Sequence, residues 1–296
     1  MIPFLVTVDT EQDVAPHFKT YLGLDYLPDL VTLFEEEEIQ ATFFVTGKIG
    51  EEHPEIFEHL KMHEVGCHGL EHELYGRKPP WLKEGLKLPV EEREKRLKKA
   101  THLLEEAAHS KVTGFRAPYF QIDEKTLDIL EQLGYAYDSS VYTYRYGWPF
   151  QIYHPAPDDR LARGTMRIVE IPVSSDPFPE KIGHSTLPSS RRHFRLNLTF
   201  LRLFGVDKCI KAMENIKAFQ DFLRVPPFFV FWMHSWELHP DPPWKQSPIP
   251  AYLYWNCYQS FELLRTFFEE IKKRWKICFL TASDAVEELG INTAVL

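Results

Sequence analysis

The sequence predicts an α/β protein folded as a distorted (β/α)7-8 barrel, with its active site at the C-terminal ends of the strands. Short β-type runs alternate with helical patterns along the chain of 296 residues, as in parallel sheets with right-handed crossovers. One barrel accommodates a chain of this length, so we expect a single domain over residues 1–296. Polar residues follow several of the predicted strands, where barrels gather their chemistry.

The predicted strands are short runs rich in β-branched and aromatic residues, at 2–8, 41–45, 65–67, 111–115, 136–138, 167–173, 228–232 and 277–280. The predicted helices are segments whose apolar residues recur three and four positions apart. They span 29–37, 54–63, 90–108, 124–133, a region ending near 223, 258–274 and 283–289. Ser283 is the expected N-cap of the last helix.

Three stretches are predicted as loop insertions in the barrel, near 76–89, 142–159 and 238–251. They are rich in proline, which punctuates regular structure, and in Trp and Tyr, which suit stacking on the faces of sugars. We expect them to form the rim of a cleft, although loops that merely cover the barrel mouth fit the pattern equally well.

The composition narrows the function. Hydrophobic residues make up 44% of the chain, enough for a sizeable core, and the formal charge of −9 argues against a nucleic-acid partner. No run approaches the ~20 apolar residues of a transmembrane helix. The first strand does not resemble a secretory leader, and the four cysteines show no C-x-x-C spacing, so we expect a cytoplasmic protein.

Residues 190–204 mix Arg with Phe and Leu. Such a segment can be an amphipathic element in peripheral contact with a membrane surface or a lipid-linked substrate. The favoured interpretation is a partly buried helix whose Arg stems lie over apolar surface.

The first candidate site is a pair of histidines, His68 and His72. On a helical turn, residues four apart share a face and could bind one metal ion. The acids Asp9, Glu11 and Asp13 follow the first strand, where they would share a face, and one of them could complete a His/His/carboxylate set of the kind zinc prefers. A chance spacing among 13 histidines and an acidic cap of the next helix are the alternatives.

Three further candidates also follow predicted strands: Arg116, Asp138 and His234. An Arg at a barrel mouth can orient a carboxylate through paired hydrogen bonds. His234 emerges after five apolar residues, where a general acid should stand, and a carboxylate such as Asp138 could hold its tautomer. A structural salt bridge is the alternative for Arg116.

The ordered series of motifs resembles the polysaccharide deacetylase family, carbohydrate esterase family 4. His68-Gly-Leu-Glu-His72 resembles H-(S/T)-x-x-H, Arg116-Ala-Pro-Tyr119 matches R-x-P-Y, Asp138-Ser-Ser matches the fourth motif and Trp232-Met-His234 resembles the last. Two motifs depart from the family pattern: Thr7-Val-Asp-Thr-Glu replaces T-F-D-D-G, and Gly69 replaces Ser or Thr. The altered first motif most resembles branches associated with exopolysaccharide and surface-glycan biosynthesis.

The resemblance implies a metal-dependent deacetylase that removes an N-acyl group, first of all acetyl, from an amino sugar of a glycan or glycan precursor. The implied ligands of a divalent metal, with zinc as the default, are His68, His72 and either Glu11 or Asp9. The implied catalytic residues are Asp9 as base, Arg116 as its orienting group, the backbone N–H of Tyr119 as oxyanion donor, and His234 paired with Asp138 as acid. Hydrolysis of a non-sugar or cyclic amide, and a non-catalytic glycan-binding relative, are the alternatives.

Overall fold

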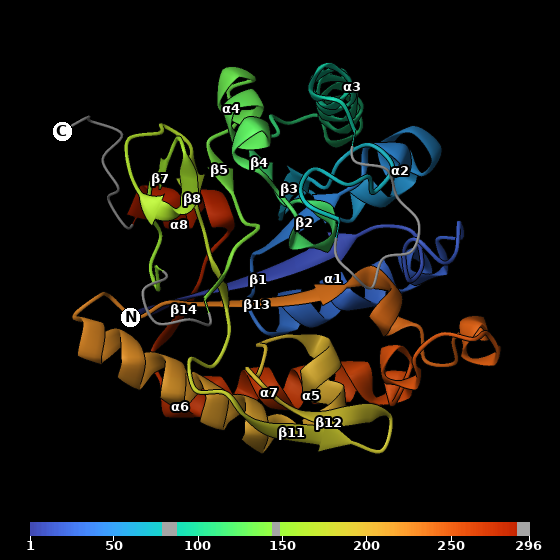
Figure 1. Cartoon of the computed structure of the whole chain (residues 1–296). Coiled ribbons are helices and arrows are strands. Elements are labelled where there is room, and N and C mark those ends of the chain that lie inside the picture. The colour runs from blue at the N-terminus through green and yellow to red at the C-terminus, as the bar shows by residue number, and fades with distance from the viewer. Residues whose placement is uncertain (79–87, 144–148, 289–296) are drawn as a thin grey trace.

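A computed structural model of the chain describes residues 1–78, 88–143 and 149–288. Its centre is one sheet of eight parallel strands in the order β13-β1-β2-β3-β4-β5-β9, with β14 paired to β1. The sheet curls into a half-barrel, as the sequence predicts (Figure 1). The strands are β1 (Ile2–Thr10), β2 (Ala41–Val45), β3 (Glu64–Cys67), β4 (Gly114–Phe115), β5 (Tyr137–Asp138), β9 (Val169–Glu170), β13 (Phe229–His234) and β14 (Ile277–Phe279).

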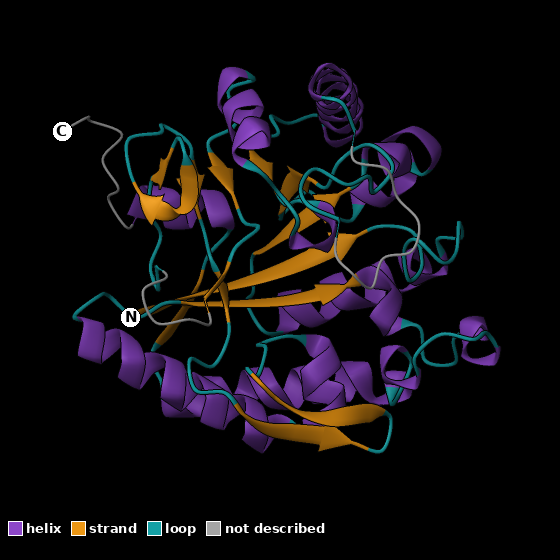
Figure 2. Cartoon of the chain, viewed as in Figure 1, coloured by secondary structure: helices purple, strands orange, loops and turns teal. Residues whose placement is uncertain are grey.

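Helices cover the outside of the sheet (Figure 2). In the view of Figure 1, α3 and α4 lie above β1 and β13, whereas α6 and α7 lie below them. The α-helices are α1 (Leu27–Glu36), α2 (Gly47–Glu52), α3 (Val90–Ala108), α4 (Glu124–Gln132), α5 (Leu198–Phe204), α6 (Val206–Leu223), α7 (Ser260–Arg274) and α8 (Ala282–Glu288). Short 3-10 helices span Leu22–Tyr26, Pro54–Glu58, Pro118–Phe120, Ser235–Leu238, Pro243–Gln246, Ala251–Leu253 and Cys257–Gln259. Thr281, rather than Ser283, receives a hydrogen bond in the first turn of α8, from the N–H of Asp284.

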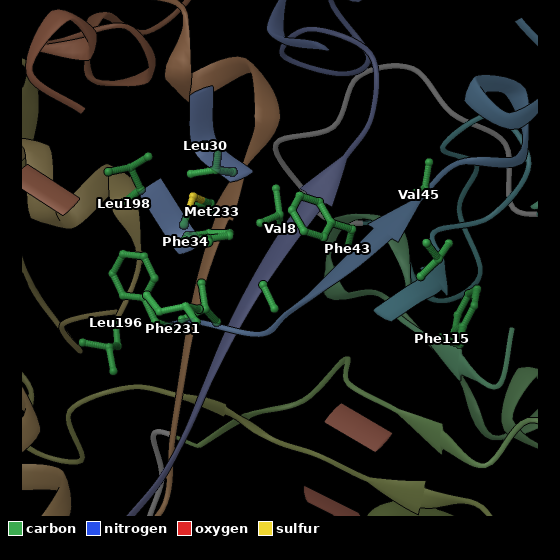
Figure 3. Close-up of a cluster of buried hydrophobic side chains, with 14 of the residues drawn as sticks. Val8, Leu30, Phe34, Phe43, Val45, Phe115, Leu196, Leu198, Phe231 and Met233 are labelled. Atoms are coloured by element: carbon green, nitrogen blue, oxygen red, sulfur yellow. The ribbon is translucent and has the colours of Figure 1, made fainter. Parts of the chain in front are cut away.

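The two faces of the sheet bury different clusters, because successive side chains of a strand point to opposite faces. Val8, Phe43 and Phe231 pack against the helices on the outer face (Figure 3). Leu5 and Trp232 belong to a second cluster on the concave face. The same alternation directs the side chains that follow them along β1 and β13 into the mouth of the half-barrel.

Smaller β-elements stand outside this sheet. The strand predicted at 167–173 is divided between β9 and β10 (Val173–Ser174), and β10 pairs with β6 (Tyr142–Thr143). Two antiparallel hairpins, β7–β8 (Pro155–Ala156, Asp159–Arg163) and β11–β12 (Glu180–His184, Leu187–Arg192), were not predicted from the sequence.

Residues 190–204 therefore form the end of a hairpin and then the short helix α5. Phe194, Leu196, Leu198 and Leu201 are fully buried in the outer core, so these side chains are not available to insert into a membrane. The predicted buried helix is confirmed only over α5, because residues 190–197 are not helical. In the described part of the chain, no helix is both long and apolar enough to span a bilayer.

Parts of two of the three predicted insertions fall outside the described residues. Residues 79–87 of the first and 144–148 of the second lie outside the described residues. The third contains buried Trp244, which packs with Val14 and Trp236 in a small aromatic cluster. Because Trp236 follows β13 directly, this insertion lies beside the mouth of the half-barrel.

Candidate metal centre

Glu11, His68 and His72 converge at the C-terminal ends of β1 and β3. Each offers one ligand atom to a group in which all these atoms lie within 4.8 Å of one another. The Nε2 atom of His68 is 3.3 Å from Oε2 of Glu11, and Nε2 of His72 contacts the same oxygen. All three side chains are buried. The predicted pairing of the two histidines with an acid of the first motif is thus present, with Glu11 as the acid.

The histidines meet through an irregular loop, and the predicted helical turn is wrong. Gly69 and His72 both have positive φ angles, of 80° and 63°. The Glu73 carboxylate accepts hydrogen bonds from the N–H groups of Leu70 and Glu71, at 3.1 and 2.7 Å, and so fixes the loop. A Cβ atom at residue 69 would lie 3.0 Å from the Tyr75 ring in a conformation that favours glycine, which explains why Ser or Thr is absent there.

The hydrogen-bonding pattern fits a metal ligand. His68 Nδ1 lies 2.7 Å from the carbonyl oxygen of Arg116. Because a carbonyl only accepts, Nδ1 donates this hydrogen bond, and Nε2 is the ring atom that faces Glu11. Burial opposes ionisation of Glu11, yet the neighbouring His72 and His68 hold the pKa of its carboxyl well below the usual value. Two imidazoles and one carboxylate therefore suit a divalent ion with coordination positions left open.

Asp9 is bound by Arg116 and is not a member of this group. The guanidinium is fully buried, and its Nη1 donates to Asp9 Oδ1 at 2.9 Å and to Thr7 Oγ1 at 2.8 Å. Its Nε and Nη2 donate to the carbonyl and hydroxyl oxygens of Ser139. Arg116 thus orients one acid of the first motif while Glu11 reaches the histidines.

Asp13 does not join the site, although the sequence predicted one face for all three acids. Its carboxylate accepts hydrogen bonds from the Thr20 hydroxyl and from the N–H groups of Leu22 and Gly23. These hydrogen bonds close the loop after β1 and cap the next short helix. Asp13 therefore has the structural role given above as the alternative to metal binding.

His234 also lies beside Glu11, with Nε2 4.0 Å from Glu11 Oε1. Its partner is Glu237: Nδ1 of His234 lies 3.0 Å from Glu237 Oε1. The second oxygen of Glu237 accepts from Arg202 Nη2 at 2.6 Å and from the Thr199 hydroxyl at 2.8 Å. The predicted pairing of His234 with Asp138 is therefore wrong.

Sequence reasoning missed Glu237 and Arg202. Burial opposes ionisation of Glu237, yet Arg202 and His234 hold its pKa at about 2. Glu237 in turn contributes to a raised pKa of His234, against the effect of burial. The spacing H-x-x-E places both side chains on one short turn and was the available signal, whereas nothing in the sequence links Arg202 to that turn.

Asp138 instead forms a buried acid pair with Glu170 on the neighbouring strand. Burial raises the pKa of Asp138 to about 6, and burial together with Asp138 raises that of Glu170 well above its usual value. Ser140 donates to Asp138 at 2.6 Å and accepts the N–H of Ala117 at 2.8 Å. Asp138 therefore supports the loop after Arg116 rather than the acid at His234.

Tyr119 lies beside the histidines at a strained position. Its φ angle is 58°, and its ring packs edge-on against His72 with 4.5 Å between ring centroids. Burial raises the pKa of the Tyr119 hydroxyl. The R-A-P-Y turn thus borders the metal centre beside His72.

Comparisons with known proteins show the family and the fold. A family model described as polysaccharide deacetylase matches residues 10–137. The chain belongs to the polysaccharide deacetylase family. A peptidoglycan deacetylase from Helicobacter pylori is 28% identical over 120 residues, which are 39% of this chain and 36% of the relative, so the match spans only about a third of that protein.

Solved structures share the fold. A protein from Mycobacterium smegmatis described as a polysaccharide deacetylase has a TM-score of 0.62 and 20% identity, covering 97% of this chain and 89% of its own. A pseudoenzyme of carbohydrate esterase family 4 from Bacillus anthracis has a TM-score of 0.52 and 14% identity, covering 96% and 65%. The fold is thus shared with a pseudoenzyme, so it does not show whether this chain is catalytic. The side chains of the site have to be considered for that question.

Metal content should separate the two acids of the first motif. We expect Glu11→Gln to weaken metal binding by at least about 100-fold, because even residues behind the ligands contribute 10–100-fold. Asp9→Asn should retain stoichiometric metal, since Asn can still accept the hydrogen bond from Arg116. Elemental analysis of both purified variants checks this. Loss of metal in Asp9→Asn with metal retained in Glu11→Gln would make Asp9 the ligand.

The Asp138–Glu170 pair should make stability depend on pH. The folded pair holds a proton that carboxyls of the unfolded chain release near pH 4, so stability falls as pH rises from about 4 through 6 and beyond. Glu170→Gln should therefore raise Tm by a few degrees at pH 8 relative to the wild type, and give little or no gain at pH 4.5. Thermal unfolding at both pH values checks this; an equal shift at both would exclude the titration.

Proposed function

We propose that the protein is a metal-dependent hydrolase that removes an N-acyl group, first of all acetyl, from an amino sugar of a glycan or glycan precursor. The observation that carries the proposal is the convergence of Glu11, His68 and His72 beside His234, which is paired with Asp9 across β1 and β13. A divalent ion held there supplies a polarised carbonyl and a water of lowered pKa. Zinc is the first choice for this donor set, although other divalent ions bind similar ligands.

Asp9 is the proposed general base. Arg116 holds one oxygen of its carboxylate at 2.9 Å, which leaves the other to accept the proton of the attacking water. The side chain is buried, as is Arg116, so few solvent molecules compete for that proton. Arg116 is thus assigned the positioning role that the sequence predicted.

His234 is the proposed general acid. An amide nitrogen is a poor leaving group until it is protonated, and His234 can donate the proton from Nε2 while Nδ1–H stays bonded to Glu237. The anionic Glu237, fixed by Arg202, favours the protonated imidazole. We assign the backbone N–H of Tyr119 to the developing oxyanion, where one donor stabilises the transition state by ~3 kcal/mol.

The intact donor set weighs against a non-catalytic glycan-binding relative. Thr10 replaces the second acid of the usual first motif, but Glu11 occupies the place of a third ligand. A pure binder has no need of a buried base, an oriented acid and three convergent ligands together. A hydrolase acting on a non-sugar or cyclic amide would use the same groups, so only a substrate panel distinguishes it.

Substitution of a metal ligand and of the proposed acid should have different effects on metal binding and on activity. His68→Ala should lose both metal and acetate release from N-acetylglucosamine oligosaccharides. His234→Ala should retain metal and lose about 10²–10⁴-fold in kcat, the usual contribution of general acid catalysis. Acetate release and elemental analysis check both variants, and stoichiometric metal in His68→Ala would remove it from the ligand set. Turnover of cyclic amides alone would favour the alternative substrate class.

Glu237 and Asp138 offer a matched test of which carboxylate serves His234. Glu237→Gln should lower kcat about 10–100-fold with metal retained, because the anion that orients and charges His234 is gone. Asp138→Asn should change kcat by less than about threefold, since Asn can still bond to Ser140 and Glu170. Steady-state kinetics with Tm as a folding control checks the pair. A larger loss in Asp138→Asn would restore the partner predicted from the sequence.

A further inference from the structure

Residues 194–197 bridge β10, which stands outside the main sheet, and the edge strand β13. The N–H of Leu196 donates to the carbonyl of Ser174 in β10, and its own carbonyl accepts from Trp232 in β13. Phe194 and Leu196 are fully buried in the outer core, where Figure 3 shows Leu196 in the cluster that contains Phe231. Because side chains alternate along an extended segment, Arg195 points to the opposite, concave face.

Contacts confirm this placement of Arg195. Its guanidinium carbon lies 5.0 Å from the centroid of the Tyr142 ring. The Tyr142 ring lies 6.3 Å from the ring of Trp232, which is 5.1 Å from the ring of His234. Phe120, next to the proposed oxyanion donor, is 4.5 Å from Tyr142. Arg195 thus stands on the same face as the proposed acid, two aromatic rings away from it.

The guanidinium of Arg195 is exposed. Arg116 and Arg202 are bonded to carboxylates, whereas within the described ranges Arg195 forms no ion pair and has only its aromatic contact. Arg192 adds a second positive charge: the charges of Arg195 and Arg192 both act on the Tyr252 hydroxyl, against the effect of burial on its pKa. In a chain of net charge −9, this is a local concentration of unneutralised cations at the mouth.

The loop that carries Tyr252 is tied to the acid. Arg202 Nη2 donates to the carbonyl of Leu253 at 3.3 Å and to Glu237 at 2.6 Å. One residue therefore fixes both the partner of His234 and the loop that carries Tyr252. Among the described residues, the buried indole N–H of Trp232 has no acceptor, so the lining of this region offers donors as well as positive charge.

We propose that Arg195, supported by Arg192, is an anion subsite, and that the substrate glycan carries a carboxylate or phosphate group near the acylated amino sugar. This inference rests on the proposed function for the position of the scissile amide. A guanidinium binds either oxyanion through two parallel hydrogen bonds, and the Tyr142 ring beneath it can pack against a sugar face. The apolar side chains of the segment are buried, so the anion belongs to the substrate rather than to a membrane surface.

Binding of paired probes to the metal-loaded protein tests the subsite without requiring turnover. Chitotetraose and a heparosan tetrasaccharide both contain N-acetylglucosamine, but only the second carries glucuronate. N-acetylglucosamine and its 1-phosphate form the phosphate pair. We expect calorimetry to give a Kd about tenfold lower for at least one charged probe than for its neutral counterpart, as for one charge-assisted contact. The pair that shows the preference identifies the source of the anion.

Arg195→Gln should abolish the preference. Arg191→Gln is the matched control, because it removes the same charge from an exposed position of β12 and should keep the preference. No preference for either charged probe in the wild type, or an equal loss in both variants, would overturn the proposal. Charge preference without acetate release would uphold the subsite and count against the hydrolase, whereas acetate release with no charge preference would do the reverse.

Discussion

The buried guanidinium of Arg116 is the interaction on which the rest of the site depends. Moving such a charge out of water costs several kcal/mol unless it is paired and its donors are satisfied. Here Asp9, Thr7 and Ser139 accept its hydrogen bonds, and its guanidinium carbon lies 4.3 Å from the Phe44 ring centroid. Its carbonyl also orients His68. One residue after β4 therefore links the ends of β1, β3 and β5.

The other buried acids also have neighbours that offset the cost of burying their charge. Glu237 has Arg202 and His234, and Asp138 and Glu170 occupy adjacent positions where a shared proton relieves their repulsion. Glu11 is different, because the basic side chains that contact it are imidazoles rather than a permanently charged guanidinium. A divalent ion would supply the missing positive charge, so the electrostatics and the donor set support the same conclusion.

The sequence predicted the parts of the site that strand ends determine. In a parallel half-barrel, the carboxyl ends of strands meet at one mouth, so His68, Arg116, Asp138 and His234 are brought to that mouth by topology alone. The loop between the histidines was mispredicted, because positive φ angles at Gly69 and His72 have no periodic signature. The polar pairings depend on packing between distant segments; Arg202 and Glu237, for example, are 35 residues apart. The pattern of strands along the sequence does not predict such pairings.

Asp138 shows why a motif position does not fix a role. The residue lies at the end of β5, as predicted, yet its carboxyl shares a proton with Glu170 on the neighbouring strand. A partly protonated carboxyl is a poor partner for an imidazolium. The orienting anion is supplied instead by Glu237, which is usable only because Arg202 on α5 holds it ionised. The extended segment that leads into α5 also carries Arg195. A stretch outside the recognised motifs therefore fixes the charge state of the proposed acid and contributes positive charge beside it, so changes in this stretch alter both at once.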